Sequence, residues 1–254
     1  MEQFKIIPLK VGEFTGIEKS NLTYQIDQGY KFAAPIIMYL VKGKDKLILV
    51  DSGPSDEEWA AKYHHGMIQT EEMKPVNALK AVGVDVGDID ILINTHLHWD
   101  HSFNNGLFPN AKIYVQRKEM QYAISPLPPH YVYYESHQIG MKAKWLDSID
   151  RIIALDGDYD LMPGIKIVTI PGHTPGMQGV LVNTAKGNIL IASDCCGLFE
   201  NWEGKGFHTH IPSGIHVNLT DYYESFKKMD ALTKFILPGH DPKVFDHKEY
   251  PFEE

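Results

Sequence analysis

The feature that most constrains this chain is a dense group of potential metal ligands that follows the apolar run 89–94. Four such side chains stand within six residues: His96, His98, Asp100 and His101. Zinc in proteins takes imidazole and carboxylate ligands in a tetrahedron, and catalytic sites leave one position to water. One ion therefore cannot comfortably take all four side chains. Two adjacent metal ions fit the spacing better.

Three more potential ligands follow later in the chain, each at the end of an apolar run and beside turn-forming residues. They are His173 in PGHTPG, Asp194 in IASDCC and His240 in PGHD. Loops at strand ends are where a rigid scaffold usually holds functional side chains. The chain has 13 histidines, and an isolated one is usually structural or exposed. We interpret five of them in this way: His64, His65, His130, His137 and His247.

The apolar pattern predicts alternating strands and helices. Two strands joined by a polar turn at 42–46 are expected within 35–53, with further strands at 90–94, 112–116, 165–170, 179–184, 188–193 and within 235–241. Helices are expected at 56–66, 75–84, about 117–123 and 220–232. Several neighbouring strands are joined by hairpin turns, which favours sheets covered by helices over a purely parallel doubly wound sheet. No linker or low-complexity tract divides the chain, so we expect a single domain over residues 1–254.

Composition excludes several classes of function. The formal net charge is −9, from 24 basic and 33 acidic residues, which argues against a nucleic-acid partner. No stretch approaches the roughly 18 apolar residues of a membrane span, and no secretory signal is visible at the N-terminus. The only cysteines are the neighbours Cys195 and Cys196, so a disulfide framework is not expected. We therefore expect a cytoplasmic protein with a small-molecule substrate and no membrane partner.

The His-x-His-x-Asp-His pattern and its flanks together resemble the metallo-β-lactamase-fold hydrolases. Within that superfamily the chain most resembles the N-acyl-homoserine lactonases. The segments that carry the resemblance are 48–53, 96–101, 112–120, 156–167, 171–176 and 239–241. The resemblance implies an α/β fold, an αββα sandwich of two mixed β-sheets with helices on the outer faces.

The resemblance also implies roles for individual residues. One metal ion would be held by His96, His98 and His173, and the other by Asp100, His101 and His240. Asp194 would bridge the two ions together with a hydroxide, so Asp100 and Asp194 are expected to be catalytic. Asp51 would accept a hydrogen bond from a ligand histidine and fix its tautomer, although a simple turn residue is an equal alternative.

Two divalent ions about 3.5–4 Å apart make a bridging hydroxide available at neutral pH and polarise a carbonyl. Zinc is the first expectation, and mixed N/O ligands also admit iron, manganese or cobalt. The leading interpretation is a metal-dependent hydrolase that opens a lactone ring, an acyl-homoserine lactone or another small lactone. Alternatives are hydrolysis of a thioester or cyclic amide, or an iron-dependent redox protein, for which Cys195 and Cys196 beside Asp194 are the argument.

One position departs from the lactonase pattern. Such lactonases usually carry a tyrosine three residues after the bridging aspartate, where its hydroxyl assists the carbonyl and leaving oxygens, but here the residue is Gly197. We expect His208 or His210, in the glycine-rich loop 199–216, to replace that hydroxyl. Expected pocket walls are 12–24, 125–137 and 199–216. The tyrosines of the second wall are alternatives for substrate contact, packing or a homodimer interface: Tyr131, Tyr133 and Tyr134.

Overall fold

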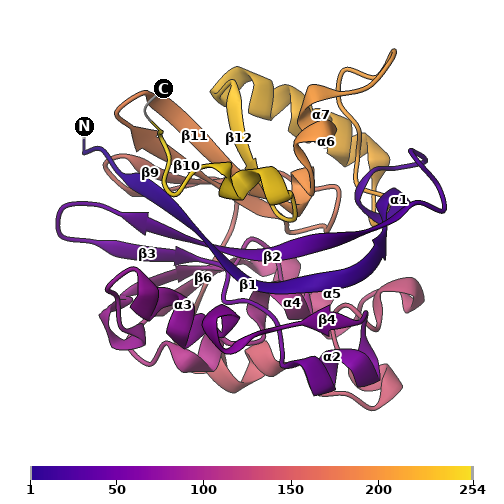
Figure 1. Cartoon of the computed structure of the whole chain (residues 1–254), viewed down its shortest axis with the longest axis horizontal. Coiled ribbons are helices and arrows are strands. Elements are labelled where there is room, and N and C mark those ends of the chain that lie inside the picture. Colours follow the sequence, from indigo (N-terminus) through magenta and orange to yellow (C-terminus); the bar gives the residue numbers. More distant parts are fainter. Residues whose placement is uncertain (1, 253–254) are drawn as a thin grey trace.

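The computed structural model describes residues 2–252 as two stacked β-sheets with helices on their outer faces (Figure 1). The strands of the first sheet are β1 (Lys5–Glu18), β2 (Lys31–Lys42), β3 (Leu47–Val50), β4 (Met67–Ile68), β5 (Ile91–Ile93), β6 (Lys112–Gln116) and β7 (Ile152–Leu155). The strands of the second sheet are β8 (Tyr159–Met162), β9 (Ile165–Thr169), β10 (Gln178–Thr184), β11 (Gly187–Ser193) and β12 (Phe235–Pro238). The helices are α1 (Lys19–Leu22), α2 (Glu57–Tyr63), α3 (Pro75–Ala81), α4 (Trp99–Ser102), α5 (Arg117–Ile124), α6 (Phe199–Glu203) and α7 (Leu219–Leu232). The αββα sandwich expected from the sequence is confirmed.

Both sheets are mixed. Within the described residues the strand orders are β4-β1-β2-β3-β5-β6-β7 and β12-β11-β10-β9-β8. In the first sheet β3, β5, β6 and β7 run parallel, while β1, β2 and β3 pair antiparallel. In the second sheet only the β11–β12 pair is parallel among the described strands. The loops that follow β3, β5, β9, β11 and β12 meet at one edge of the sandwich, and they carry the candidate site.

Three apolar layers hold the sandwich together. Successive residues of a strand point to opposite faces of the sheet. Ile93 and Ile191 therefore lie in the core between the two sheets, whereas Leu92 faces α3 and Leu190 faces α7. Every residue of β5 is buried, because both faces of this strand are covered. The metal-ligand motif thus leaves the end of a central, rigid strand.

The helices begin where the sequence places capping residues. Asp56 accepts a hydrogen bond from Trp59 N at 2.8 Å and starts α2, and Pro75 occupies the first turn of α3. Asn218 caps α7 by accepting from the backbone of Thr220. The four helices expected from the sequence are confirmed as α2, α3, α5 and α7, with ends shifted by a few residues.

Strand β1 was not expected from the sequence, and it includes part of one expected pocket wall. Residues 12–18, expected to be an irregular loop, belong to this long strand. Register shifts between Lys10 and Gly12 and between Phe14 and Ile17 interrupt its pairing with β2. Such bulges break the period-two pattern by which a strand is recognised in a sequence. The short strands β4, β7 and β8 were missed as well.

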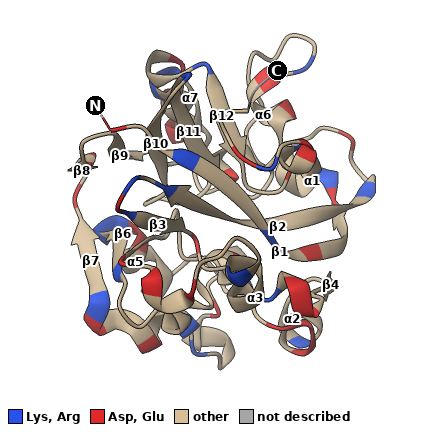
Figure 2. Ribbon diagram, turned by 60° about the vertical axis from the view of Figure 1, so that its left-hand side comes forward, with Lys and Arg blue, Asp and Glu red and all other residues tan. Residues whose placement is uncertain are grey.

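The surface carries both signs of charge. Figure 2 shows Lys and Arg interleaved with Asp and Glu on helices and loops of both layers, with no continuous basic stripe in that view. Among the described residues, no helix has the length and apolar character that crossing a membrane requires.

Candidate metal centre

All seven potential ligands of the sequence analysis converge at the edge of the sandwich where the strand-end loops meet. Their ligand atoms form three overlapping groups, each within 4.8 Å: His96, His98 and His173; His96, His101 and Asp194; Asp100, His101 and His240. None of the seven residues is more than 7% exposed. Among the described residues, none of the five histidines interpreted as isolated belongs to a group. The side chain of His64 and the residue His130 are nevertheless buried.

The backbone at two of these strand ends is strained. Asp51 after β3 has φ of 63° and Ser193 at the end of β11 has φ of 47°, a region that non-glycine residues rarely occupy. Gly239 lies just before His240, and a Cβ there would be 2.3 Å from Asp194 Oδ1. Only glycine allows this approach. Strain and close contact of this kind are typical of functional sites, where the surrounding structure enforces them.

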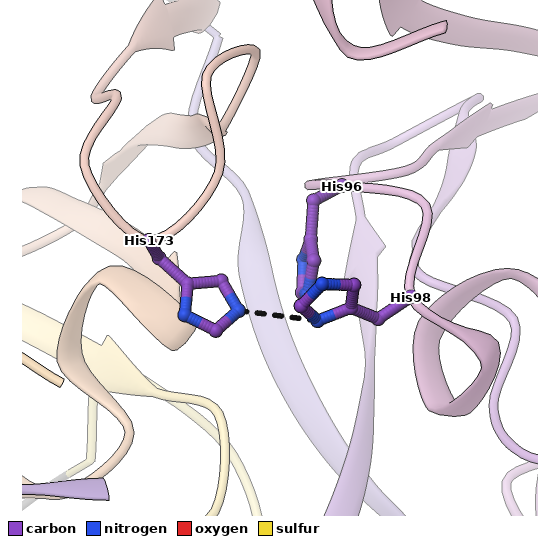
Figure 3. Close-up of side chains that lie close together, drawn as sticks. All are labelled: His96, His98 and His173. Carbon is purple, nitrogen blue, oxygen red and sulfur yellow. Dashed lines mark hydrogen bonds between the residues drawn. The ribbon is translucent and has the colours of Figure 1, made fainter. Parts of the chain in front are cut away.

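Three histidines form one half of the centre. His96 and His98 come from the loop after β5, and His173 points toward them from the loop after β9 (Figure 3). His173 Nε2 and His98 Nδ1 lie 3.2 Å apart. In a tetrahedral zinc site with Zn–N distances of about 2.0–2.1 Å, two ligand nitrogens lie about 3.3 Å apart. The spacing therefore fits two ligands of one ion.

The other half is formed by Asp100 and His101 on α4 and by His240. Asp100 Oδ2 lies 3.4 Å from His101 Nε2 and 3.7 Å from His240 Nε2. Asp194 stands between the halves. Its Oδ1 lies 3.4 Å from His101 Nε2 and 3.2 Å from His240 Nε2, and its Oδ2 lies 3.6 Å from His173 Nε2. One carboxylate thus reaches both halves, as the bridging role requires.

Unpaired polar atoms show that the cluster fits a metal. Six buried side-chain atoms have no hydrogen-bond partner within the described part of the chain. Four of them belong to this cluster: His96 Nε2, His98 Nε2, His101 Nε2 and Asp194 Oδ1. Buried polar atoms without partners are rare because they cost free energy. Bound cations would satisfy His96 Nε2, His101 Nε2 and Asp194 Oδ1, so these donors suit divalent metal ions. His98 faces His173 through its other ring nitrogen, Nδ1.

Burial and neighbouring charges set the protonation states. Burial lowers the pKa of His96 and His98 well below the usual value, and the neighbouring histidines lower it further. Neutral imidazole is the form that binds metal. Burial raises the pKa of Asp100, but the charges of His101 and His240 outweigh this effect and lower it to about 2. Asp100 is therefore an ionised carboxylate at neutral pH.

Three of the histidines are oriented through their second ring nitrogen. His101 Nδ1 lies 2.8 Å from Asp51 Oδ2, His173 Nδ1 lies 2.7 Å from the Ile215 carbonyl, and His240 Nδ1 lies 2.9 Å from the Pro35 carbonyl. Such contacts fix the tautomer of metal-binding histidines. The contact expected between Asp51 and a candidate ligand histidine is confirmed, and Asp51 also accepts from Thr95 N at 2.7 Å.

The two histidines expected to replace the missing tyrosine hydroxyl have other surroundings. His210 Nδ1 lies 2.7 Å from the Trp202 carbonyl, and its Nε2 lies 3.0 Å from Asp230 Oδ2. His208 lies in a tight backbone turn, with its ring beside Phe207, which is 90% exposed. Their role in turnover stays a prediction, and these contacts speak against it, because neither ring nitrogen of His210 is free.

The tyrosines of residues 131–134 differ from one another. Tyr134 is 1% exposed and donates a hydrogen bond to Glu119, so packing explains it. Tyr133 is half-buried, and its ring centroid lies 5.3 Å from that of His98. Burial raises the pKa of Tyr133, and the charge of Asp100 raises it further. Tyr133 therefore lies beside the centre.

Gly197 stands where related lactonases usually carry a tyrosine. Leu22 lies 3.3 Å from the point where a Cβ of Gly197 would stand.

Sequence reasoning missed Glu119, which lies in the first turn of α5 and is fully buried. It accepts hydrogen bonds from both loops that carry the three-histidine half. The sequence gives no signal for this role, because a charged residue at the start of a helix is ordinarily exposed.

The chain matches the family model of the Metallo-beta-lactamase superfamily over residues 35–240. An N-acyl homoserine lactonase of Bacillus thuringiensis is 32% identical over 240 residues, which cover 89% of this chain and 88% of the relative. The N-acyl homoserine lactonase AttM of Agrobacterium fabrum is 32% identical over 181 residues, 67% of this chain and 65% of the relative.

Solved structures agree with the sequence relatives. An N-acyl homoserine lactone hydrolase with the product N-hexanoyl-L-homoserine bound at its catalytic metal centre superposes with a TM-score of 0.79 at 27% identity, covering 97% of this chain and 96% of that chain. The dizinc lactonase AidC, at 20% identity and a TM-score of 0.68, supports the fold alone. On its sequence, its sandwich and its site, the chain belongs to the metallo-beta-lactamase superfamily and, within it, to the N-acyl homoserine lactonase family of metal-dependent hydrolases.

Proposed function

We propose that this protein hydrolyses the ring ester of a small lactone, with N-acyl homoserine lactones as the first substrate class to test. The observation that carries the proposal is the convergence of seven buried histidines and aspartates into three overlapping groups, with Asp194 within 3.6 Å of both His173 and His240. The names of the relatives support the substrate class. We further propose that the chain acts as a single domain in the cytoplasm.

We propose that His96, His98 and His173 hold one divalent ion and that Asp100, His101 and His240 hold the other, with Asp194 between them. Zinc is the first candidate, since the donors are imidazoles and carboxylates. The chemistry that such a pair of ions would supply is an ionised water near neutral pH and polarisation of an ester carbonyl.

The protein's own residues prepare this centre. Burial keeps His96 and His98 neutral, so each offers a lone pair without first losing a proton. Asp100 and Asp194 supply two negative charges that offset the charge of the ions. Asp51 fixes the His101 ring through Nδ1, which turns Nε2 toward Asp194.

We assign the substrate-facing hydroxyl to Tyr133. Its backbone carbonyl accepts from Trp99 N at 3.0 Å, so the tyrosine is fixed to the segment that carries Asp100 and His101. Its ring lies beside His98. A phenol here donates a hydrogen bond to the oxygen that gains charge when the ester carbonyl is attacked.

The burial of the cysteine pair argues against the redox alternative. Cys195 and Cys196 are both fully buried, and they pack with Met229 and Phe226 of α7. Burial raises the pKa of Cys196 well above its usual value, so the reactive thiolate form is disfavoured.

A hydrolysis screen with zinc-reconstituted protein tests the proposal. Acid release at constant pH is measured for N-acyl homoserine lactones of several chain lengths, simple γ-lactones, acyl thioesters and β-lactams. We expect kcat/KM for at least one lactone to exceed that for every thioester and β-lactam. If a thioester or a cyclic amide is the best substrate, the proposal of lactone hydrolysis is wrong and the centre hydrolyses that class of compound instead.

A further inference from the structure

Glu119 is a fully buried carboxylate that none of the described lysines or arginines contacts through a salt bridge. Charged side chains are almost never fully buried unless they are paired or fully hydrogen-bonded. Glu119 is instead surrounded by neutral donors. The segments to which those donors belong explain why the carboxylate is buried here.

Four donors contact the two carboxylate oxygens. Oε1 accepts from Leu97 N at 3.0 Å and from the Tyr134 hydroxyl at 2.7 Å. Oε2 accepts from the Thr174 hydroxyl at 2.7 Å and from Gly176 N at 3.1 Å. Oε1 therefore holds the loop that contains Leu97, together with Tyr134, and Oε2 holds the loop that contains Thr174 and Gly176.

These segments are the two loops of the three-histidine half. Leu97 stands between His96 and His98, and Thr174 directly follows His173. One carboxylate thus joins, through short and rigid links, the loop after β5 to the loop after β9.

The packing around Glu119 is equally specific. A Cβ at Gly176 would lie 2.2 Å from Glu119 N, so only glycine lets the loop after His173 approach the start of α5 this closely. The glycine and the carboxylate together set the distance between the loop and the helix.

We propose that Glu119 is a positioning residue for the three-histidine half, and that it raises the affinity of this half for a divalent ion by fixing the distance between His98 and His173. The inference rests on the metal centre proposed above. The half formed by Asp100, His101 and His240 does not depend on Glu119, because Asp51 holds His101 in place.

Glu119→Gln is the sharpest change, because it keeps the size of the side chain. Its amide replaces one acceptor oxygen by a donor, which then faces an N–H or O–H of one loop. That loop loses its links, and the separation of the histidine nitrogens is no longer enforced. Loss of partners that orient metal ligands typically costs 10–100-fold in metal affinity. We expect a loss of about tenfold or more.

Zinc affinity, measured by competition with a chromogenic chelator, is compared in two reference proteins. His240→Ala removes a ligand of the half formed by Asp100, His101 and His240, so the three-histidine half is better preserved. His173→Ala removes a ligand of the three-histidine half, so the other half is better preserved. We expect Glu119→Gln to weaken zinc binding about tenfold or more in the first protein and less than threefold in the second. Equal weakening in both, or none in the first, would overturn the inference. Failure of both reference proteins to bind zinc would overturn the metal centre itself.

A matched tyrosine pair covers the case in which Glu119→Gln does not fold. Tyr134 and Tyr122 lie side by side, with ring centroids 5.5 Å apart, but only Tyr134 donates to Glu119, and the Tyr122 hydroxyl contacts His130. In the His240→Ala protein, Tyr134→Phe should weaken zinc binding severalfold and Tyr122→Phe should leave it unchanged. Identical affinities for the two variants would contradict the role of Glu119.

Discussion

At the scale of single residues, the centre depends on backbone conformations that most side chains avoid. Ser193, with φ of 47°, directs the carboxylate of the following Asp194 into the cluster, and Gly239 leaves room for its Oδ1. Asp194 Oδ1 then lies 3.2 Å from His240 Nε2, and Oδ2 lies within reach of both halves, 3.3 Å from His240 Nε2 and 3.6 Å from His173 Nε2. A strained residue and a glycine on neighbouring strands therefore create the single shared ligand of the proposed centre.

The role proposed for the Tyr133 hydroxyl can also be tested by changing a single residue. We expect Tyr133→Phe to lower kcat on the best lactone by about 10²-fold with both metal ions retained, as removal of an oxyanion donor does. We expect His208→Ala and His210→Ala each to lower it less than tenfold, because the ring nitrogens of His210 already have partners. Steady-state kinetics with parallel metal analysis measure both. Full activity in Tyr133→Phe would remove the tyrosine from the mechanism.

The residues that sequence could and could not assign differ in a physical way. Each of the seven candidate ligands follows a recognisable strand, so a motif and a strand end locate it. Glu119 and Tyr133 gain their positions only from tertiary packing, which no local pattern records. His210 looked available in the sequence because its partner Asp230 lies on α7, twenty residues later.

At the scale of elements, helix α2 and the residue that follows it, His64, connect the segment 125–137 to the loop that carries the His-x-His-x-Asp-His motif. Trp59 Nε1 donates to Glu135 Oε1 at 2.7 Å, and His64 Nε2 lies 3.1 Å from the same oxygen. The His64 ring stacks on Trp99 at a centroid distance of 4.0 Å. The wall that carries Tyr133 is thus tied to the segment that carries Asp100. From sequence, this segment could be recognised only as irregular, because its order comes from such distant contacts.

His130 makes this segment sensitive to acid. Burial lowers its pKa to about 4, with His173 and His216 adding to the effect. In the unfolded chain a histidine has a pKa of about 6.5, so it is protonated in a pH range in which His130 of the folded protein stays neutral. Stability therefore falls as pH decreases from about 6.5 to about 4. We expect His130→Asn to lose less thermal stability than the wild type between pH 7.5 and 5. Parallel pH dependences of the two melting temperatures would contradict this.

At the scale of the whole molecule, the candidate centre joins the two sheets. Asp51 and the motif 96–101 leave the first sheet, whereas His173, Asp194 and His240 leave the second. Ions bound at the proposed centre would therefore link the two sheets, which also pack against each other through the apolar core between them.

Removal of metal should consequently destabilise the entire sandwich. An ion present at about 1,000 times its dissociation constant adds about 4 kcal/mol to the free energy of unfolding. For a chain of this size that corresponds to a melting temperature shift on the order of 10 °C. We expect the melting temperature to fall by this amount in excess chelator and to recover when zinc is restored. A melting temperature that is independent of chelator would contradict a metal link between the sheets.

The most direct test of the account is the number of metal ions per chain in fully active protein, measured by elemental analysis. We expect close to two ions in the wild type, about one in His173→Ala, about one in His240→Ala, and fewer than one in Asp194→Asn, because that residue serves both halves. One ion per chain at full activity, or two ions retained in either histidine variant, would contradict the dinuclear centre.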